Sequence, residues 1–173
     1  REKRIIFLLL FFILVLIGKN INFSPLVGAE NQFFTLYQFF GPTAGAFLGP
    51  IFGGISVLIA QVADFFIVGK EWSLISLLRF LPMLFAVYYF GYFKRKDKMS
   101  GTVVSVIVPL ICIALFILHP VGREVWFFSL YWLIPVLAKI LPEKVPGSLL
   151  FRSYGATFAA HAVGGAIWIW TVP

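Results

Sequence analysis

Charged side chains inside apolar stretches are the residues of this sequence best suited to chemistry. Asp64 and Arg79 each lie within such a stretch, and Gln61 precedes Asp64 by about one helical turn. Because charge in lipid is costly, such residues usually pair or line a ligand path. Counted at about 1.5 Å per residue from the predicted helix ends, both charges lie roughly 8 to 11 Å deep. We expect them to face one interior space and to form or approach an ion pair, with a purely structural pair as the alternative.

Three further polar residues are candidates for the same space. His161 lies near the middle of the last apolar stretch, where it is either an interhelical hydrogen-bond donor or a ligand-facing group. Glu30 and Asn31 belong to a polar segment that is either a lid over an outward-facing cavity or an ordinary solvated loop. The predicted ligand-binding set is Glu30, Asn31, Gln61, Asp64, Arg79 and His161.

The composition indicates which elements must position these side chains. The chain is 61% hydrophobic and 12% charged, with a mean hydropathy of +0.98, whereas soluble domains are about 25% charged. Runs such as Ile5–Ile17 carry no charge, and lipid tolerates such backbone only in helices or closed barrels. Strict period-2 alternation is missing, which excludes a barrel. We predict an all-α integral membrane protein, a single domain over residues 1–173 with six to seven transmembrane helices.

The stretch 33–68 is either one very long helix or two spans joined by a tight turn at Gly49-Pro50. Two spans place the basic loop Lys94–Lys98 on the same side as Arg1–Arg4, as the positive-inside rule requires, so we favour two. We therefore expect a multi-pass protein of the cytoplasmic membrane, with its basic loops in the cytoplasm. The predicted apolar segments are about Ile5–Ile21, Phe33–Leu48, Pro50–Val68, Trp72–Phe93, Thr102–Leu118, Val125–Leu141 and Leu149–Val172.

The beginning of the chain also resembles a signal peptide, because basic residues precede an apolar run and Val27-Gly28-Ala29 resembles a cleavage site. That site lies too far beyond the run for a usual cleavage region. We interpret the segment as a retained first helix.

Small residues recur every four positions in two places. Such stripes let helix backbones approach closely in lipid, either within one bundle or against another membrane subunit. We predict both stripes to be packing or docking positions; they consist of Gly41, Gly45, Gly49 and Gly53, and of Ala156, Ala160 and Gly164.

Several function classes are not supported by the sequence. The net charge of +7 comes from basic residues in short loops, which indicates membrane orientation rather than nucleic-acid binding. Cys112 is the only cysteine, so neither an intrachain disulfide nor a thiolate metal cluster can form. Hydrolase, metalloprotease, P-loop and dinucleotide motifs are missing. We expect no enzymatic activity, cofactor or metal, and any transport role requires a partner or an ion gradient.

The run Phe47–Gly54, continuing to Gln61 and Asp64, resembles the Gly-Pro-x-x-Gly…Asp stretch of substrate-binding S components of energy-coupling factor (ECF) vitamin transporters. The resemblance covers about thirty residues; size, hydropathy and the basic loop Lys94–Lys98 are also similar. It implies capture of a vitamin-like ligand near the outer surface and docking on a transmembrane coupling subunit that works with ATPases. The chain departs from the family pattern in its seven apolar segments instead of six and in the missing Ala-x-x-x-Ala pattern of the first helix. Nickel and cobalt members carry a histidine near the amino terminus, which this chain lacks, so the resemblance does not imply a metal substrate.

Three functions are consistent with these observations. The leading hypothesis is a membrane-embedded substrate-capture subunit of a small-molecule importer. The alternative is a structural or assembly subunit of a larger membrane complex, for which the small-residue stripes are equally suited. A weaker third is an intramembrane enzyme using Asp64, Arg79 and His161. A cavity of about 300 Å³ or more lined by the named residues favours capture, whereas a solid bundle favours the structural role.

Overall fold

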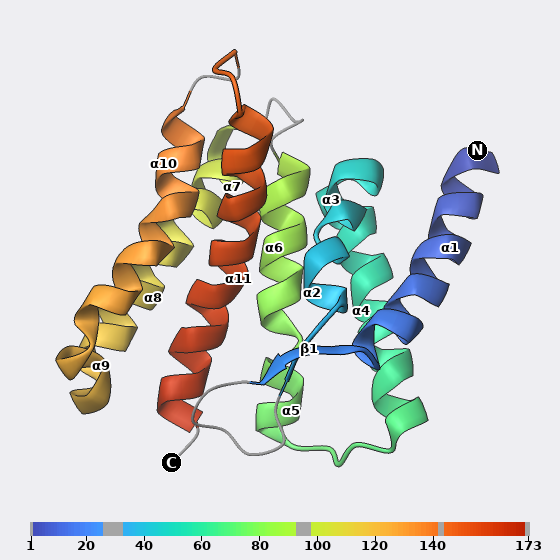
Figure 1. Ribbon diagram of the computed structural model, residues 1–173, viewed down its shortest axis with the longest axis horizontal. Helices are drawn as coiled ribbons and strands as arrows, with labels where there is room; N and C mark the ends of the chain where they lie inside the picture. The colour runs from blue at the N-terminus through green and yellow to red at the C-terminus, as the bar shows by residue number, and fades with distance from the viewer. Residues whose placement is uncertain (1, 26–32, 93–97, 142–143, 172–173) are drawn as a thin grey trace.

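The computed structural model describes residues 2–25, 33–92, 98–141 and 144–171 and shows a bundle of helices with one small β-hairpin (Figure 1). The helices pack around α6 (Leu81–Tyr92), which contacts α3 (Thr43–Leu48), α4 (Pro50–Val68) and α11 (Ser148–Thr171). The remaining elements are α1 (Glu2–Lys19), β1 (Asn22–Pro25), β2 (Phe33–Thr35), α2 (Tyr37–Phe40), α5 (Leu74–Leu78), α7 (Lys98–Thr102), η1 (Val103–Ile107), α8 (Val108–Leu118), α9 (Pro120–Glu124), η2 (Trp126–Leu133) and α10 (Ile134–Ile140).

The first predicted segment is a helix that ends at Lys19 rather than at Ile21, and strands β1 and β2 follow as an antiparallel pair. This hairpin corrects the expectation of helix alone over 33–48, because the chain becomes helical only at Tyr37. The alternation that marks a strand is too short to detect here, since β2 has three residues.

The choice between one helix and two over residues 33–68 is settled by the backbone at Gly49. This residue has a φ of 82° and ends α3, and Pro50 then begins α4. A positive φ favours glycine, and proline suits the first helical position because its missing N–H needs no partner there. The predicted tight turn at Gly49-Pro50 is therefore confirmed.

Three other predicted helices contain breaks at their prolines or aromatic clusters. The segment Trp72–Phe93 divides into α5 and α6 at Arg79-Phe80, since Pro82 has no N–H to bond the Leu78 carbonyl four residues earlier. A π-helical turn, η1, precedes Pro109, which lies in the first turn of α8. The segment Val125–Leu141 begins as the 3₁₀ helix η2 and becomes α-helical at Ile134, next to Pro135.

The buried core consists of three clusters along the bundle. The first joins α1, α2, α3, α4 and α6 around Val15, Val57 and Val87; the second joins α8, η2 and α11 around Trp132 and Ala162. The third surrounds Tyr89, whose hydroxyl donates to the Pro135 carbonyl at 3.1 Å. Large apolar side chains also cover the outside of the helices, Ile67 and Leu74 being 69% and 73% exposed. Such an apolar exterior suits lipid rather than water.

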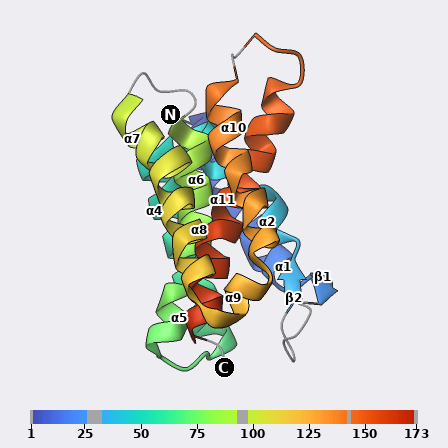
Figure 2. The ribbon, with the colours of Figure 1, turned by 90° about the vertical axis from the view of Figure 1, so that its left-hand side faces the viewer.

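Within the described residues, three helical stretches are long and apolar enough to cross a membrane: Pro50–Val68, Leu74–Tyr92 and Met99–Leu118. Two shorter apolar helices, Ile5–Lys19 and Trp126–Ile140, accompany them. The bundle has two distinct ends, and both views place the hairpin, α5 and α9 at one of them (Figures 1 and 2). We call this the hairpin end. The beginnings of α1 and α7 lie at the opposite end.

Candidate functional site

A cavity of about 930 Å³ is lined in part by residues of β2 and α5, two of the elements at the hairpin end. It is lined by residues from α1, β2, α2, α4, α5, α6, α8, η2 and α11, so most of the bundle contributes to it. Four of the six predicted ligand-binding residues line this single space: Gln61, Asp64, Arg79 and His161. Glu30 and Asn31 lie outside the described residues.

Asp64 is the centre of the charged part of the cavity wall. Its carboxylate is 3% exposed and accepts a hydrogen bond from the Lys19 ammonium, with Nζ and Oδ2 2.8 Å apart. A second ammonium, that of Lys70, lies 3.7 Å from the same oxygen. Two cations thus compensate one buried carboxylate, whose burial without a partner would be costly.

The predicted ion pair between Asp64 and Arg79 is wrong in its partner. Among the described residues, Asp64 pairs with Lys19 and Lys70, and no ion pair involves Arg79. The reason is helix geometry: α1 ends beside Asp64, whereas Arg79 caps the short helix α5, with its backbone N–H bonded to the Ile75 carbonyl. Arg79 nevertheless lines the same cavity and remains exposed within it.

Helix α4 positions Gln61 and Asp64 together. Their three-residue spacing puts them on one helix face, and both are buried. The Gln61 amide donates to the Phe80 carbonyl at 3.4 Å, at the break between α5 and α6. The α4 face thereby contacts both α1, through Lys19, and the residues that follow Arg79.

Tyr37 adds an unsatisfied polar atom to this wall. It begins α2, is 3% exposed, and its hydroxyl has no hydrogen-bond partner within the described structure. The Lys19 ammonium lies 5.6 Å from the centre of the Tyr37 ring, within the range of a cation–π interaction. A buried hydroxyl without a partner costs free energy, so it is a natural position for a ligand acceptor.

Aromatic rings form a second part of the cavity wall, from β2, η2 and α11. The His161 ring lies 5.6 Å from Phe34 and 5.8 Å from Phe158, and Phe158 stacks on Tyr131 at 5.8 Å. All four rings line the cavity. His161 therefore faces a ring-lined space near the middle of α11, and the choice between an interhelical donor and a ligand-facing group stays a prediction.

Three residues of the glycine stripe pack closely against other helices of this same chain. A Cβ atom on Gly45 would collide with the Val87 carbonyl oxygen of α6, one on Gly41 would lie 2.5 Å from the Met83 sulfur, and one on Gly53 would lie 2.7 Å from the Ala44 carbonyl. Close packing within the bundle accounts for these three. Gly49 is instead the turn residue between α3 and α4.

On α11, the predicted stripe lies along the side that meets the rest of the bundle. Ala156 is buried, Ala160 packs on the cluster around Val57, and a Cβ on Gly164 would lie 3.5 Å from the Pro82 ring. Docking of either stripe on another subunit stays a prediction.

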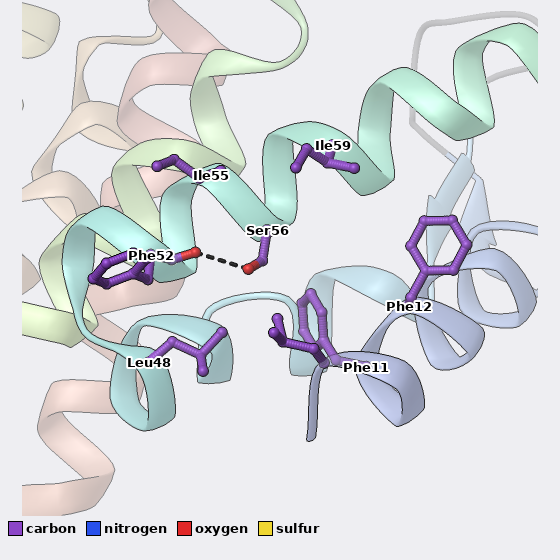
Figure 3. A pocket seen from close by; sticks show the side chains of 8 residues that line it. Phe11, Phe12, Leu48, Phe52, Ile55, Ser56 and Ile59 are labelled. Carbon is purple, nitrogen blue, oxygen red and sulfur yellow. Dashed lines mark hydrogen bonds between the residues drawn. The ribbon is translucent and has the colours of Figure 1, made fainter. Parts of the chain in front are cut away.

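A second, smaller hollow of about 480 Å³ lies between α1 and the α3–α4 hairpin (Figure 3). Its wall is apolar except for Ser56, whose hydroxyl donates to the Phe52 carbonyl at 2.8 Å. Figure 3 shows phenylalanine and leucine or isoleucine side chains around that one hydrogen bond. Ser56 is the one polar side chain among its lining residues, and its proton is already donated, so this hollow is less suited to a polar ligand than the larger cavity.

Sequence reasoning missed Lys19, Tyr37 and Lys70 as cavity residues. Lys19 carried the same signal as Asp64, an ionisable side chain inside a predicted span, but its place near the end of that span resembled an interface residue. Tyr37 and Lys70 had no distinguishing signal. Within the described part of the chain, no three His, Cys, Asp or Glu side chains come together in a way that could hold a metal ion.

None of the protein-family models, curated proteins or solved structures compared with this chain matches it.

Proposed function

We propose that this chain is a membrane-embedded subunit that captures a small molecule for import. The observation that carries the proposal is the cavity of about 930 Å³, whose wall contains Gln61, Asp64, Arg79 and His161. Its volume is at the upper end of the range of about 300–1,000 Å³ typical of ligand pockets. A purely structural subunit has no need to keep so large a space around several charged side chains.

The proposed orientation places the hairpin end outside the cell. The described basic residues divide unevenly between the two ends: Lys19, Lys70, Arg79 and Arg123 belong to segments at the hairpin end, and the opposite end has Lys3, Arg4, Lys98, Lys139, Lys144 and Arg152. An excess of Lys and Arg marks the cytoplasmic side of a membrane protein. In this orientation, with six to seven segments crossing the membrane, the cavity lies in the outer half of the bundle, where a subunit that captures a ligand from outside requires it.

Release of a ligand to the cytoplasm requires a partner or an ion gradient, since the sequence has no nucleotide-binding motif, and a partner is the form proposed here. The resemblance of Phe47–Gly54 to the ECF S components suggests a transmembrane coupling subunit with ATPases as that partner. Gly41, Gly45 and Gly53 are not assigned to the partner contact, because atoms of this chain already occupy the space beside them.

Small molecules that copurify with the protein test the proposal. Protein purified in mild detergent is denatured, and the released compounds are identified by mass spectrometry for the parent and two tryptophan variants. Thr157→Trp fills part of the cavity, whereas Ser153→Trp places the same bulk one turn earlier on α11, outside the cavity wall. The two positions are well matched, since each hydroxyl bonds the carbonyl four residues before it.

We expect one non-lipid compound to copurify with the parent and with Ser153→Trp, and to be lost from Thr157→Trp. A parent protein that releases lipids alone would favour the structural-subunit alternative. Equal recovery of the compound from both variants would place its binding site elsewhere.

A further inference from the structure

We propose that the cavity selects a small organic anion that carries a flat ring, with its carboxylate at Arg79 and Tyr37 and its ring against Phe34, Phe158 and His161. This inference rests on the capture function proposed above and names the class of ligand. It follows from the charges of the described wall, from one unsatisfied hydroxyl and from the arrangement of the rings.

The charge of the wall favours an anion. The described charged residues of the cavity are Lys19, Lys70 and Arg79 against Asp64 alone, which is a surplus of two positive charges. Lys19 is already bonded to Asp64, and Lys70 shares the same carboxylate. Arg79 is the cation of this wall for which the described structure provides no carboxylate partner. A guanidinium binds a carboxylate through two parallel hydrogen bonds, so it is the strongest available site for an anionic group.

Tyr37 indicates where an acceptor atom is needed. Its hydroxyl is buried in the wall, has no hydrogen-bond partner among the described residues, and belongs to the side of the cavity formed by α1, α2 and α4. A hydroxyl is able to donate, and the ammonium beside its ring disfavours a second cation at this place. The oxygen of a carboxylate satisfies the hydroxyl, whereas an ammonium group, which has no acceptor, does not.

The rings define the other half of the ligand. Phe34, His161, Phe158 and Tyr131 are linked by successive ring contacts of 5.6 to 5.8 Å along one part of the wall. These residues come from β2, η2 and α11, whereas the charged residues come from α1, from α4 and from the residues that follow α4 and α5. A flat apolar group stacks on such rings, and only its charged end reaches the cationic side. A cavity with a cationic side and a ring-lined side selects a molecule that has both an anionic group and a flat ring.

Three matched sets of probes test this inference by thermal unfolding of the purified protein in detergent. Each set has one ring and three end groups: indole-3-acetate, indole-3-acetamide and tryptamine; naphthalene-2-acetate with its amide and amine; and phenylacetate with its amide and amine. We expect at least one carboxylate to raise the melting temperature in a saturable way, and its amide and amine to do so weakly or not at all.

Two variants assign the effect to the wall. Arg79→Gln is expected to weaken half-saturation by the best carboxylate by about tenfold or more, the loss typical of one hydrogen bond between charged groups. Arg123→Gln removes an exposed arginine of α9 that lies outside the cavity wall and is expected to change half-saturation by less than about twofold. Tyr37→Phe should also weaken carboxylate binding, while Tyr88→Phe, outside the wall, should not.

The failures of the two proposals are distinguishable. Amides or amines that bind as tightly as the carboxylates, or carboxylate binding that Arg79→Gln leaves intact, overturn the anion assignment and leave capture standing. Absence of any shift with all nine probes overturns the anion assignment as well, and capture is then decided by the compound that copurifies. Absence of both probe binding and a copurifying compound overturns the two together.

Discussion

The contact between Lys19 and Asp64 gives the sharpest quantitative prediction, because the two partners are unequally placed. Removing the charge of Asp64 by Asp64→Asn leaves two ammonium groups without their carboxylate, and one of them, Lys19, is only 17% exposed. Removing Lys19 by Lys19→Gln leaves the carboxylate with Lys70 still 3.7 Å away. Asp64→Asn should therefore be the more harmful change.

The magnitude follows from the burial of the pair. Breaking a fully buried ion pair costs about 3 to 5 kcal/mol, and losing a hydrogen bond between charged groups costs about 1.5 to 3 kcal/mol. Because Lys19 is partly exposed, we expect Asp64→Asn to lower the free energy of unfolding by about 2 to 4 kcal/mol and Lys19→Gln by roughly 1 to 2 kcal/mol. The double variant should lose less than the sum of the two.

Unfolding of the detergent-solubilised protein by titration with sodium dodecyl sulfate measures these free energies. Glu71→Gln is the control, since Glu71 is an exposed carboxylate near the same end of α4, and it should change the free energy by less than about 0.5 kcal/mol. Additive losses in the double variant, or a loss for Lys19→Gln at least as large as that for Asp64→Asn, would refute the asymmetric pairing.

Two further predictions concern packing and orientation. Gly45→Ala should destabilise the protein by about 1 to 3 kcal/mol, because the added methyl group meets the Val87 carbonyl of α6. Gly164→Ala, whose added methyl group makes only ordinary contact at 3.5 Å, should be nearly neutral in the same titration. Equal effects of the two variants would mean that α3 and α6 do not pack closely. A membrane-impermeant thiol reagent applied to intact cells should label Glu71→Cys, which follows α4 at the hairpin end. It should leave Asp97→Cys unlabelled, because basic loops such as Lys94–Lys98 resist translocation. Labelling at position 97 would reverse the proposed orientation.

The sequence predicted the features of this fold that depend on local chemistry. The turn at Gly49-Pro50 was predictable because a glycine followed by proline both ends one helix and starts another. Grouping Gln61 with Asp64 needed only the helical period, and the cost of charge in lipid was enough to select Asp64, Arg79 and His161.

Features that depend on the packing of distant segments were not predictable in this way. The partner of Asp64 was predicted wrongly because depth along each helix was known but rotation and lateral neighbours were not, and Lys19 lies 45 positions away. The hairpin was missed because its register is fixed by pairing between Ser24 and Phe34, which leaves no periodic trace in such short strands. The role proposed for Tyr37 required knowledge of which hydroxyl the described part of the fold leaves without a partner.

The central claim is that this bundle holds one small molecule in its large cavity. Native mass spectrometry of the intact protein released from detergent tests this claim most directly. The account predicts a discrete adduct of a single non-lipid compound, in a ratio of one to one, on the parent and on Ser153→Trp, and its disappearance from Thr157→Trp, where an indole occupies the cavity. A parent protein that carries only lipid adducts, or an adduct that persists unchanged in Thr157→Trp, would contradict it.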